Sequence, residues 1–157
     1  MLTEAISLLE ANNYEAAREI LDKLLEADPE DSQVNFYYGS FHDGLGNERE
    51  AIPYYEKALA NDIQGPNREM AYVQLGSSLR CIGEYEKAMK ILSNGLQEFP
   101  ANGAIKVFLA ICYYNTSEHE KSVQLLMTTL LDTSTDQSIQ QYKRALTYYK
   151  DHLNNTW

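Results

Sequence analysis

Residues 69 to 102 read EMAYVQLGSSLRCIGEYEKAMKILSNGLQEFPAN, and this stretch predicts two helices joined by a tight turn. Apolar and small side chains recur at helical spacing in each half. Gly83 is expected to end the first helix because a residue without a Cβ leaves the right-handed conformation at little cost. Pro100 is expected to end the second, since proline cannot continue a helix. At Gly76 the two helices must approach closely, and a large side chain there is expected to cost about 1 to 3 kcal/mol.

Similar residues recur before and after this stretch. Gly39 takes the place of Gly76 in the preceding unit, and Ala110 takes it in the following one. This recurrence predicts helix-turn-helix repeats, each of which buries its apolar faces against its neighbours. We expect a single domain over residues 1–157, with repeats over about 1–31, 32–65, 69–102 and 103–136 and a capping helix over about 137–153.

Local signals refine this prediction. Asn13 is expected to cap the helix that follows it by accepting from free backbone amides. The segment Gln64–Asn67 adds about three residues between the second and third repeats, and we expect it to lengthen that loop. Capping boxes are predicted at two helix starts, Asn47-x-x-Glu50 and Ser117-x-x-Glu120.

This pattern resembles the tetratricopeptide repeat. In the third repeat the signature positions of that family fall on Tyr72, Leu75, Gly76, Leu79, Gly83, Tyr85, Ala88, Leu92, Gly95 and Pro100. The resemblance implies an all-α, right-handed superhelical solenoid of four repeats plus a C-terminal capping helix. From about Tyr37 onward the chain also resembles a group of small bacterial tetratricopeptide proteins of unknown biochemical function, which implies a cytoplasmic setting.

Composition bounds the classes of function. With 44% hydrophobic and 23% charged residues the chain has a globular composition, and its net charge of −10 disfavours nucleic acid as a partner. The longest apolar run, Val107 to Tyr114, is too short to span a membrane, and the N-terminal sequence does not resemble a secretory signal. Cys81 and Cys112 lie in different repeats, which favours reduced thiols in a cytoplasm.

The charge is unevenly distributed. Residues 1–31 carry nine acids and two bases, whereas residues 137–157 carry three bases and one acid. This asymmetry is consistent with attraction of a basic partner or with end-to-end contact between copies. A solvated surface is the simpler interpretation.

The resemblance also implies that the first helix of each repeat lines a concave groove that binds peptides. Three apolar members of the predicted groove, Phe36, Phe108 and Ile111, are equally consistent with packing between helices. The groove positions are Gln33, Phe36, Tyr37, Ser40 and Asp43 in the second repeat, Met70, Val73, Gln74, Ser77, Arg80 and Cys81 in the third, and Ala104, Phe108, Ile111, Tyr114 and Asn115 in the fourth.

Asp43, Arg80 and Tyr114 occupy equivalent places in successive repeats and are expected to form a row across the groove. An Asp43–Arg80 pair there would either fix the backbone or charged terminus of a ligand or be a weak, partly exposed ion pair. Some tetratricopeptide domains hold acidic chaperone tails with a clamp of basic and amide side chains. The matching positions here carry no basic residue, which disfavours that partner.

The sequence offers little support for catalysis. Ser40, His42 and Asp43 have the residue types of a hydrolase trio, but on one helix His42 points away from the other two. We expect His42 to replace a packing aromatic instead. The other histidines do not have metal-ligand spacing, so no metal site and no cofactor are predicted. Cys81 has no neighbouring base, which favours an idle thiol over a nucleophile.

These observations favour a non-catalytic adaptor whose concave groove binds a peptide segment of another protein. The alternative is a structural role, in which a second copy of the chain occupies the groove or the end faces and forms a homo-oligomer.

Overall fold

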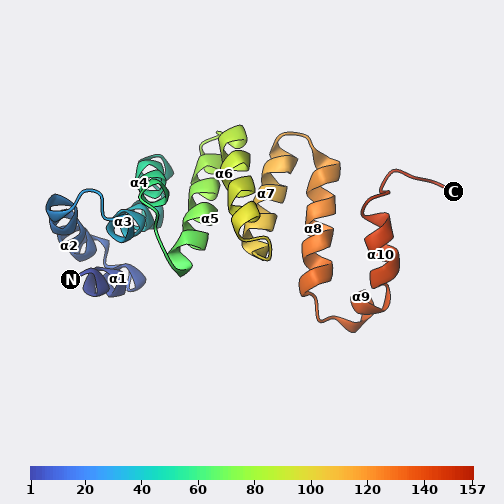
Figure 1. Ribbon diagram of the computed structural model, residues 1–157, viewed down its shortest axis with the longest axis horizontal. Helices are drawn as coiled ribbons and strands as arrows, with labels where there is room; N and C mark the ends of the chain where they lie inside the picture. Colours follow the sequence, from blue (N-terminus) through green and yellow to red (C-terminus); the bar gives the residue numbers. More distant parts are fainter.

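The computed structural model describes residues 1–157 and contains ten helices and no strand, which follow one another along an elongated array (Figure 1). The predicted all-α tetratricopeptide-like solenoid is therefore confirmed. None of the helices combines the length and the apolar run that crossing a bilayer requires. In chain order the helices are α1 (Leu2–Glu10), α2 (Tyr14–Ala27), α3 (Ser32–Gly44), α4 (Glu48–Ala60), α5 (Pro66–Cys81), α6 (Tyr85–Glu98), α7 (Gly103–Asn115), α8 (His119–Thr133), α9 (Gln137–Gln141) and α10 (Lys143–Tyr149).

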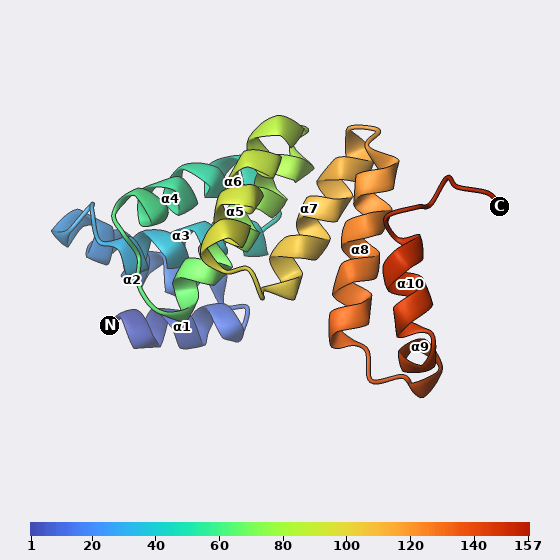
Figure 2. The same ribbon diagram turned by 45° about the vertical axis from the view of Figure 1, so that its right-hand side comes forward.

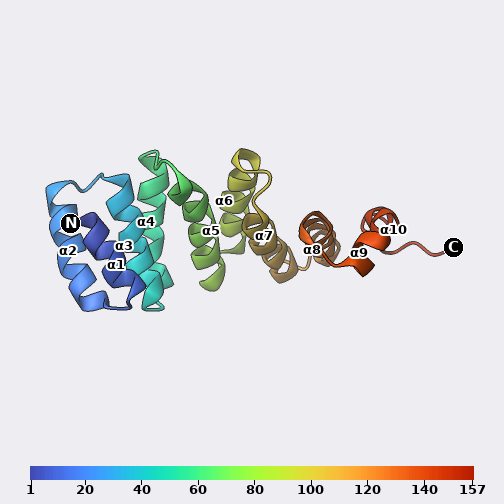
Figure 3. The same cartoon turned by 90° about the horizontal axis from the view of Figure 1, so that it is seen from below.

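Contacts between helices define an inner and an outer layer. Each of the helices α1, α3, α5 and α7 packs on the helix that follows it, and α2, α4 and α6 pack on the next unit in turn (Figures 2 and 3). The first helices α1, α3, α5 and α7 also contact one another in succession, whereas the second helices make no comparable contact. The first helices therefore form the more crowded, inner side of the array, which is the concave side of a helical solenoid.

Glycines allow the helices of one unit to nest. A Cβ at Gly76 would lie 2.5 Å from the Leu92 side chain, and a Cβ at Gly39 would lie 2.7 Å from the Tyr55 ring. Both distances are too short for non-bonded carbon atoms, so a larger residue fits only if the Leu92 or Tyr55 side chain shifts. The predicted close approach at Gly76 is confirmed.

The turns inside the units use a left-handed residue at corresponding positions. Gly46 and Gly83 have φ of +74° and +84°, and Ser117 has φ of 64°. The predicted capping boxes are wrong, because Ser117 forms the turn itself and Asn47, at the N-cap, makes no side-chain bond. The predicted Asn13 side-chain cap is absent too.

Backbone geometry explains which caps form. Asn13 and Asn47 have ψ of 69° and 62°, which is not the extended backbone typical of an N-cap. Asp31 and Asn102, at the starts of α3 and α7, have ψ of 116° and 106°, and their side chains accept from the backbone N–H of the third residue along. Side-chain caps thus form at α3, α7 and α9, whose N-cap residues have ψ above 100°, and not at the helices that follow the tight turns.

Most of the core lies in the middle of the array. The larger cluster of buried residues joins α3 through α7 and includes Phe36, Tyr55, Leu75 and Leu92. A smaller cluster joins α1, α2 and α3 around Leu21. The central helices therefore have partners on both sides.

The insertion before α5 is divided between loop and helix: Gln64 and Gly65 lie in the loop, whereas Pro66 and Asn67 begin α5, so the loop lengthens by less than the sequence predicted. Helix α5 begins at Pro66 and has 16 residues, whereas α3 and α7 each have 13. Proline suits the first turn of a helix because its missing N–H would have no partner there. Arg68, in the added turn, forms ion pairs with Asp62 and with Glu98 of α6. These pairs attach the extra turn to α6 and to the loop that precedes α5.

The C-terminal segment differs from the single capping helix predicted over residues 137–153. It consists of the short helices α9 and α10, separated at Tyr142, and neither contains a buried residue. Helix α8 buries only Ser122 and Leu131. Because α10 packs on α8 and nothing packs on its other side, little burial opposes the break.

Candidate functional site

The sequence-predicted groove residues come from α3, α5 and α7, the helices of the inner layer. Several of them are open to solvent: Met70 is 47% exposed and Tyr114 is 63% exposed, and Cys81 and Ala104 are exposed as well. The half-buried members are Gln33, Tyr37, Ser40, Asp43, Val73, Gln74, Ser77, Arg80, Phe108, Ile111 and Asn115.

Phe36 is not part of the accessible groove. It is 1% exposed, and its ring packs against Tyr37 at 5.1 Å and Tyr55 at 5.8 Å between ring centroids. The alternative interpretation, packing between helices, is therefore the one that applies to Phe36. Its apolar character gave no means to separate the two interpretations, because core and groove positions alternate on the same helix.

A hollow of about 370 Å³ opens between the N-terminal halves of α5 and α7. The sequence predicted Met70, Val73, Gln74 and Ala104 here, and it missed Pro66, Glu69 and Asn102. The rim is held in place because the Asn102 side chain donates to Glu69 Oε2 over 2.6 Å and caps α7 at the same time. Apolar side chains therefore line the hollow and fixed polar groups surround it, which suits an apolar side chain attached to a polar backbone.

The added turn of α5 supplies a second residue that the sequence missed. Asn67 donates to Gln33 Oε1 over 2.7 Å and to the Tyr37 hydroxyl over 3.1 Å. These bonds join α3 to α5 on the inner layer and orient two of the predicted groove residues. Asn67 lies in the insertion and has no counterpart in the other repeats, so the repeat pattern contained no signal for it.

Asp43 does not pair with Arg80, and the predicted ionic row is absent. Tyr55 donates to Asp43 Oδ2 over 2.8 Å, and Ser78 of α5 donates to Asp43 Oδ1 over 3.0 Å. Burial raises the pKa of Asp43 more than these hydrogen bonds lower it. Asp43 thus joins the second and third repeats, and its carboxylate is not free for a ligand.

Arg80 lies near the other end of the α5–α7 seam. Its Nη1 is 3.5 Å from Asn115 Oδ1, and its Nε is buried without a hydrogen-bond acceptor. Tyr114, the residue before Asn115, is exposed, and its ring centroid lies 5.2 Å from that of His119. This end of the seam combines an unpaired cation with an exposed aromatic ring.

The three residues of the apparent hydrolase trio do not come together. Ser40 donates to the carbonyl oxygen of Phe36, and Asp43 is held by Tyr55 and Ser78. His42 stacks on Tyr54 with ring centroids 5.4 Å apart and an interplanar angle of 14°. The expectation that His42 serves as a packing aromatic is confirmed.

Two larger hollows lie outside the predicted groove, near the C-terminal end. One of about 590 Å³ lies beside the start of α8 and Leu153, and one of about 540 Å³ lies among Tyr142, Tyr148, Tyr149 and Trp157. Both are bounded by segments that bury almost no side chain. The hollow on α5 is the better defined site, because its walls belong to the packed central repeats.

Comparison with known sequences identifies the family. A profile described as "Tetratrico peptide repeat" matches residues 32–153, and one described as "Tetratricopeptide repeat" matches residues 1–31. The chain belongs to the tetratricopeptide repeat family. Proteins of this family are generally non-catalytic scaffolds for protein–protein interaction.

Similar tetratricopeptide proteins include a sequence relative and two solved structures. The chain is 26% identical over 149 residues to TPR repeat-containing protein MJ1428 of Methanocaldococcus jannaschii, which covers 94% of this chain and 25% of that protein. MamA 41-end from Desulfovibrio magneticus RS-1 has a TM-score of 0.73 at 21% identity and covers 95% of this chain and 82% of its own. The crystal structure of the APC/C hetero-tetramer Cut9–Hcn1 has a TM-score of 0.75 at 16% identity, and the match covers 93% of this chain and 29% of that one. At such identities the structural likeness concerns the fold alone.

Proposed function

We propose that this tetratricopeptide chain is a non-catalytic adaptor that binds a peptide segment of a partner protein along the α5–α7 seam. The observation that carries the proposal is the 370 Å³ hollow, in which the exposed Met70 side chain lies among Pro66, Val73 and Ala104. A large exposed apolar group in a concave site, with polar groups at its rim, is typical of a recognition surface.

The hollow suits one apolar side chain of an extended peptide. Gln74 and the Glu69–Asn102 pair border it and offer side-chain amide and carboxylate groups to the peptide backbone. Met70 is flexible and polarizable, so it adapts to differently shaped apolar groups. We therefore expect specificity for an apolar residue, with tolerance for its exact shape.

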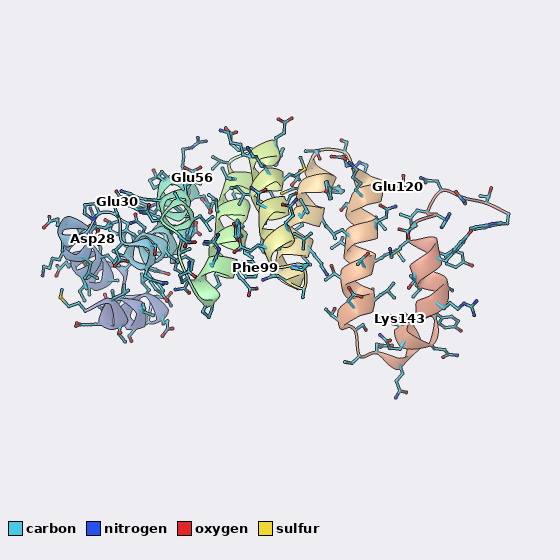
Figure 4. The ribbon with its side chains drawn as sticks, in the orientation of Figure 1. Asp28, Glu30, Glu56, Phe99, Glu120 and Lys143 are labelled. Carbon is cyan, nitrogen blue, oxygen red and sulfur yellow. The ribbon has the colours of Figure 1, made fainter.

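Site-specific photo-cross-linking tests this proposal. A benzophenone amino acid replaces Ala104 in the hollow or, as the matched control, Glu56, an exposed residue of α4 on the outer layer (Figure 4). After cross-linking in cells, adducts are digested, and the attached peptide is identified by mass spectrometry. We expect one recurrent partner segment with an apolar residue at Ala104 and no such adduct at Glu56.

A second substitution establishes whether the adduct depends on the hollow. Met70→Glu is expected to reduce the Ala104 adduct at least about tenfold, because a charge replaces a desolvated apolar contact. Since Met70 is exposed, the fold tolerates this change, and circular dichroism verifies it. An undiminished adduct in Met70→Glu, or equal adducts at both positions, would contradict the proposal.

Two further features extend the proposal, one on catalysis and one on the compartment. The dispersal of Ser40, His42 and Asp43 favours binding without catalysis. Cys81 and Cys112 are free thiols, which supports the cytoplasm as the compartment. The proposal therefore includes binding without catalysis and a cytoplasmic location.

Self-association is a second candidate, because α8 exposes an apolar stripe formed by Val123, Leu126 and Leu130. The ends of the array also differ in charge: Figure 4 shows acidic Asp28 and Glu30 in one half and Lys143 at the opposite end. Light scattering over a concentration series tests this candidate. A dimer that Leu126→Lys abolishes would support contact through the α8 stripe, and a dimer that salt dissociates would support contact between the oppositely charged ends. A monomer at all concentrations would exclude both.

A further inference from the structure

Arg80 differs from every other half-buried lysine or arginine of the protein. The remaining lysines and arginines without a carboxylate partner are all exposed to solvent. Arg80 is half-buried, and it forms no ion pair. The other half-buried lysines and arginines each have a carboxylate partner: Lys57 pairs with Glu30, Arg68 with Asp62 and Glu98, Lys106 with Asp132, and Lys150 with Asp151.

The guanidinium of Arg80 is also poorly satisfied by hydrogen bonds. Its Nε is buried without an acceptor, and its contact with Asn115 Oδ1 is long at 3.5 Å. The carboxylate at the corresponding place in the second repeat, Asp43, already accepts from Tyr55 and Ser78. A partly desolvated cation with unmade hydrogen bonds is unfavourable, so an acceptor from outside the chain would stabilise it.

We propose that Arg80 binds a carboxylate of the peptide that occupies the α5–α7 seam. This inference rests on the proposed function and adds the chemical class of a second recognition element. A guanidinium and a carboxylate form two parallel hydrogen bonds, which fix orientation as well as add affinity. The ligand carboxylate accepts from the Nη groups and, after the side chain turns outward, from Nε.

The position of Arg80 relative to the hollow sets the spacing in the ligand. Met70 and Arg80 lie ten positions apart on α5, which is about 15 Å along the helix axis. An extended peptide advances about 3.3 Å per residue, so this distance corresponds to about four to five residues. The expected ligand therefore has an apolar residue and a carboxylate separated by about that length. The carboxylate belongs either to Asp or Glu or to the C-terminus.

A peptide library distinguishes these sources. One set of decapeptides has both termini blocked, so that only side chains supply a carboxylate, and a second set has a free C-terminal carboxylate. Peptides retained by the full chain are sequenced, and fluorescence anisotropy measures their affinities. We expect retained peptides with an apolar residue followed or preceded, at the stated spacing, by an acidic residue in the first set or by the terminus in the second.

Variants separate the role of Arg80 from general charge and from folding. Arg80→Gln is expected to weaken binding of the selected peptides about tenfold or more, and Arg80→Lys is expected to restore only part of it, since lysine lacks the planar fork. Arg49→Gln, which removes an exposed charge from α4, is the matched control and should leave affinity unchanged. Circular dichroism verifies that each variant folds.

The outcomes distinguish the two proposals. Retained peptides that contain no carboxylate at this spacing, or that bind Arg80→Gln as tightly as the unchanged protein, would overturn the inference and leave the proposed function intact. Failure to retain any peptide from either set would remove both. Amidation of the C-terminus or replacement of the acidic residue by its amide should reduce affinity about as much as Arg80→Gln, and no additional loss is expected when both changes are combined.

Discussion

The third and fourth repeats carry the same residue at the same position and bury it differently. Leu92 of α6 and Leu126 of α8 are 34 positions apart, and each follows a small residue on the preceding helix, Gly76 or Ala110. Leu92 is completely buried, whereas Leu126 is 41% exposed. The difference lies in the element that follows each helix: α7 covers α6, whereas the element that follows α8 and packs on it is the short α10.

This contrast shows that burial in a repeat array belongs to the interface between units and not to the unit itself. Helices α3 to α7 have neighbours on both sides and share the larger core cluster. Helices α9 and α10 have none on their outer side and bury no residue. The hollow on α5 lies in the part of the molecule where side chains are held from both directions, and this is why its geometry is well defined.

The largest expected effect comes from truncating the two equivalent leucines. Leu92→Ala should lower the free energy of unfolding by about 2 to 5 kcal/mol, because it removes a buried side chain and leaves a cavity against Gly76. Leu126→Ala should lower it by less than about 1 kcal/mol, since much of that side chain remains in water. Urea titration followed by circular dichroism measures both. Equal losses would show that a neighbour covers α8 in solution.

Two glycines sharpen the comparison at the level of a single methyl group. A Cβ at Gly76 would lie 2.5 Å from Leu92, whereas a Cβ at Gly103 would meet only Thr129 Cγ2 at 3.7 Å. Gly76→Ala should therefore destabilise the protein by about 1 to 3 kcal/mol through overpacking. Gly103→Ala should be neutral or stabilise by up to about 1 kcal/mol, because alanine is the better helix former. Thermal unfolding of both variants beside the unchanged protein provides the measurement.

The sequence predicted the helical repeats well because their determinants are local and periodic. Gly83 and Pro100 act through backbone geometry within a few residues, and Gly76 admits Leu92 of the next helix at a spacing that recurs from repeat to repeat. The sequence did not predict the state of α9 and α10. Their apolar side chains are buried only if another element packs on them, and the local sequence pattern does not indicate whether such an element is present.

The candidate site was predicted only in part, for a related reason. Helical register placed Met70, Val73 and Gln74 on the inner layer, and the structure brings them together in one hollow. Phe36 has the same register and is buried, because Tyr55 of the neighbouring helix covers its ring, a contact that the register of α3 alone does not reveal. Asn67 acts through bonds to residues 30 or more positions away, which no repeat signature describes.

A smaller effect is expected from two asparagines, one in each region. Asn67 joins α3 to α5 with bonds of 2.7 and 3.1 Å, whereas Asn154 in the C-terminal tail donates to Glu120 over 3.3 Å on the surface. Asn67→Ala should cost about 0.5 to 1.5 kcal/mol, and Asn154→Ala should cost almost nothing. Urea titration compares the two, and a larger loss for Asn154→Ala would contradict the contrast between the regions.

The smallest expected effect concerns pH and the histidine within the packed region. Burial lowers the pKa of His42 below its usual value of 6.5, although the charges of Glu50 and Asp43 oppose that shift. His42 of the folded protein therefore stays unprotonated at pH values where the unfolded chain already binds a proton at this residue. The free energy of unfolding consequently falls as the pH decreases from about 6.5 toward the pKa of His42 in the folded protein. Between about pH 7.5 and about pH 5.5 we expect this group to lower Tm by about 1 to 3 °C.

His42→Phe isolates that contribution from all other titrations. Phenylalanine preserves the stacking on Tyr54 and removes the ionisable ring, so the variant should lose less Tm between the two pH values than the unchanged protein does. His152→Phe is the counterpart in the C-terminal region, where the ring stacks on Tyr148 of α10, a helix that buries no side chain. Because unfolding of α10 releases little burial, this second variant should retain the original dependence of Tm on pH. A larger change for His152→Phe than for His42→Phe would mean that the C-terminal segment, and not the central block, limits the stability of the array.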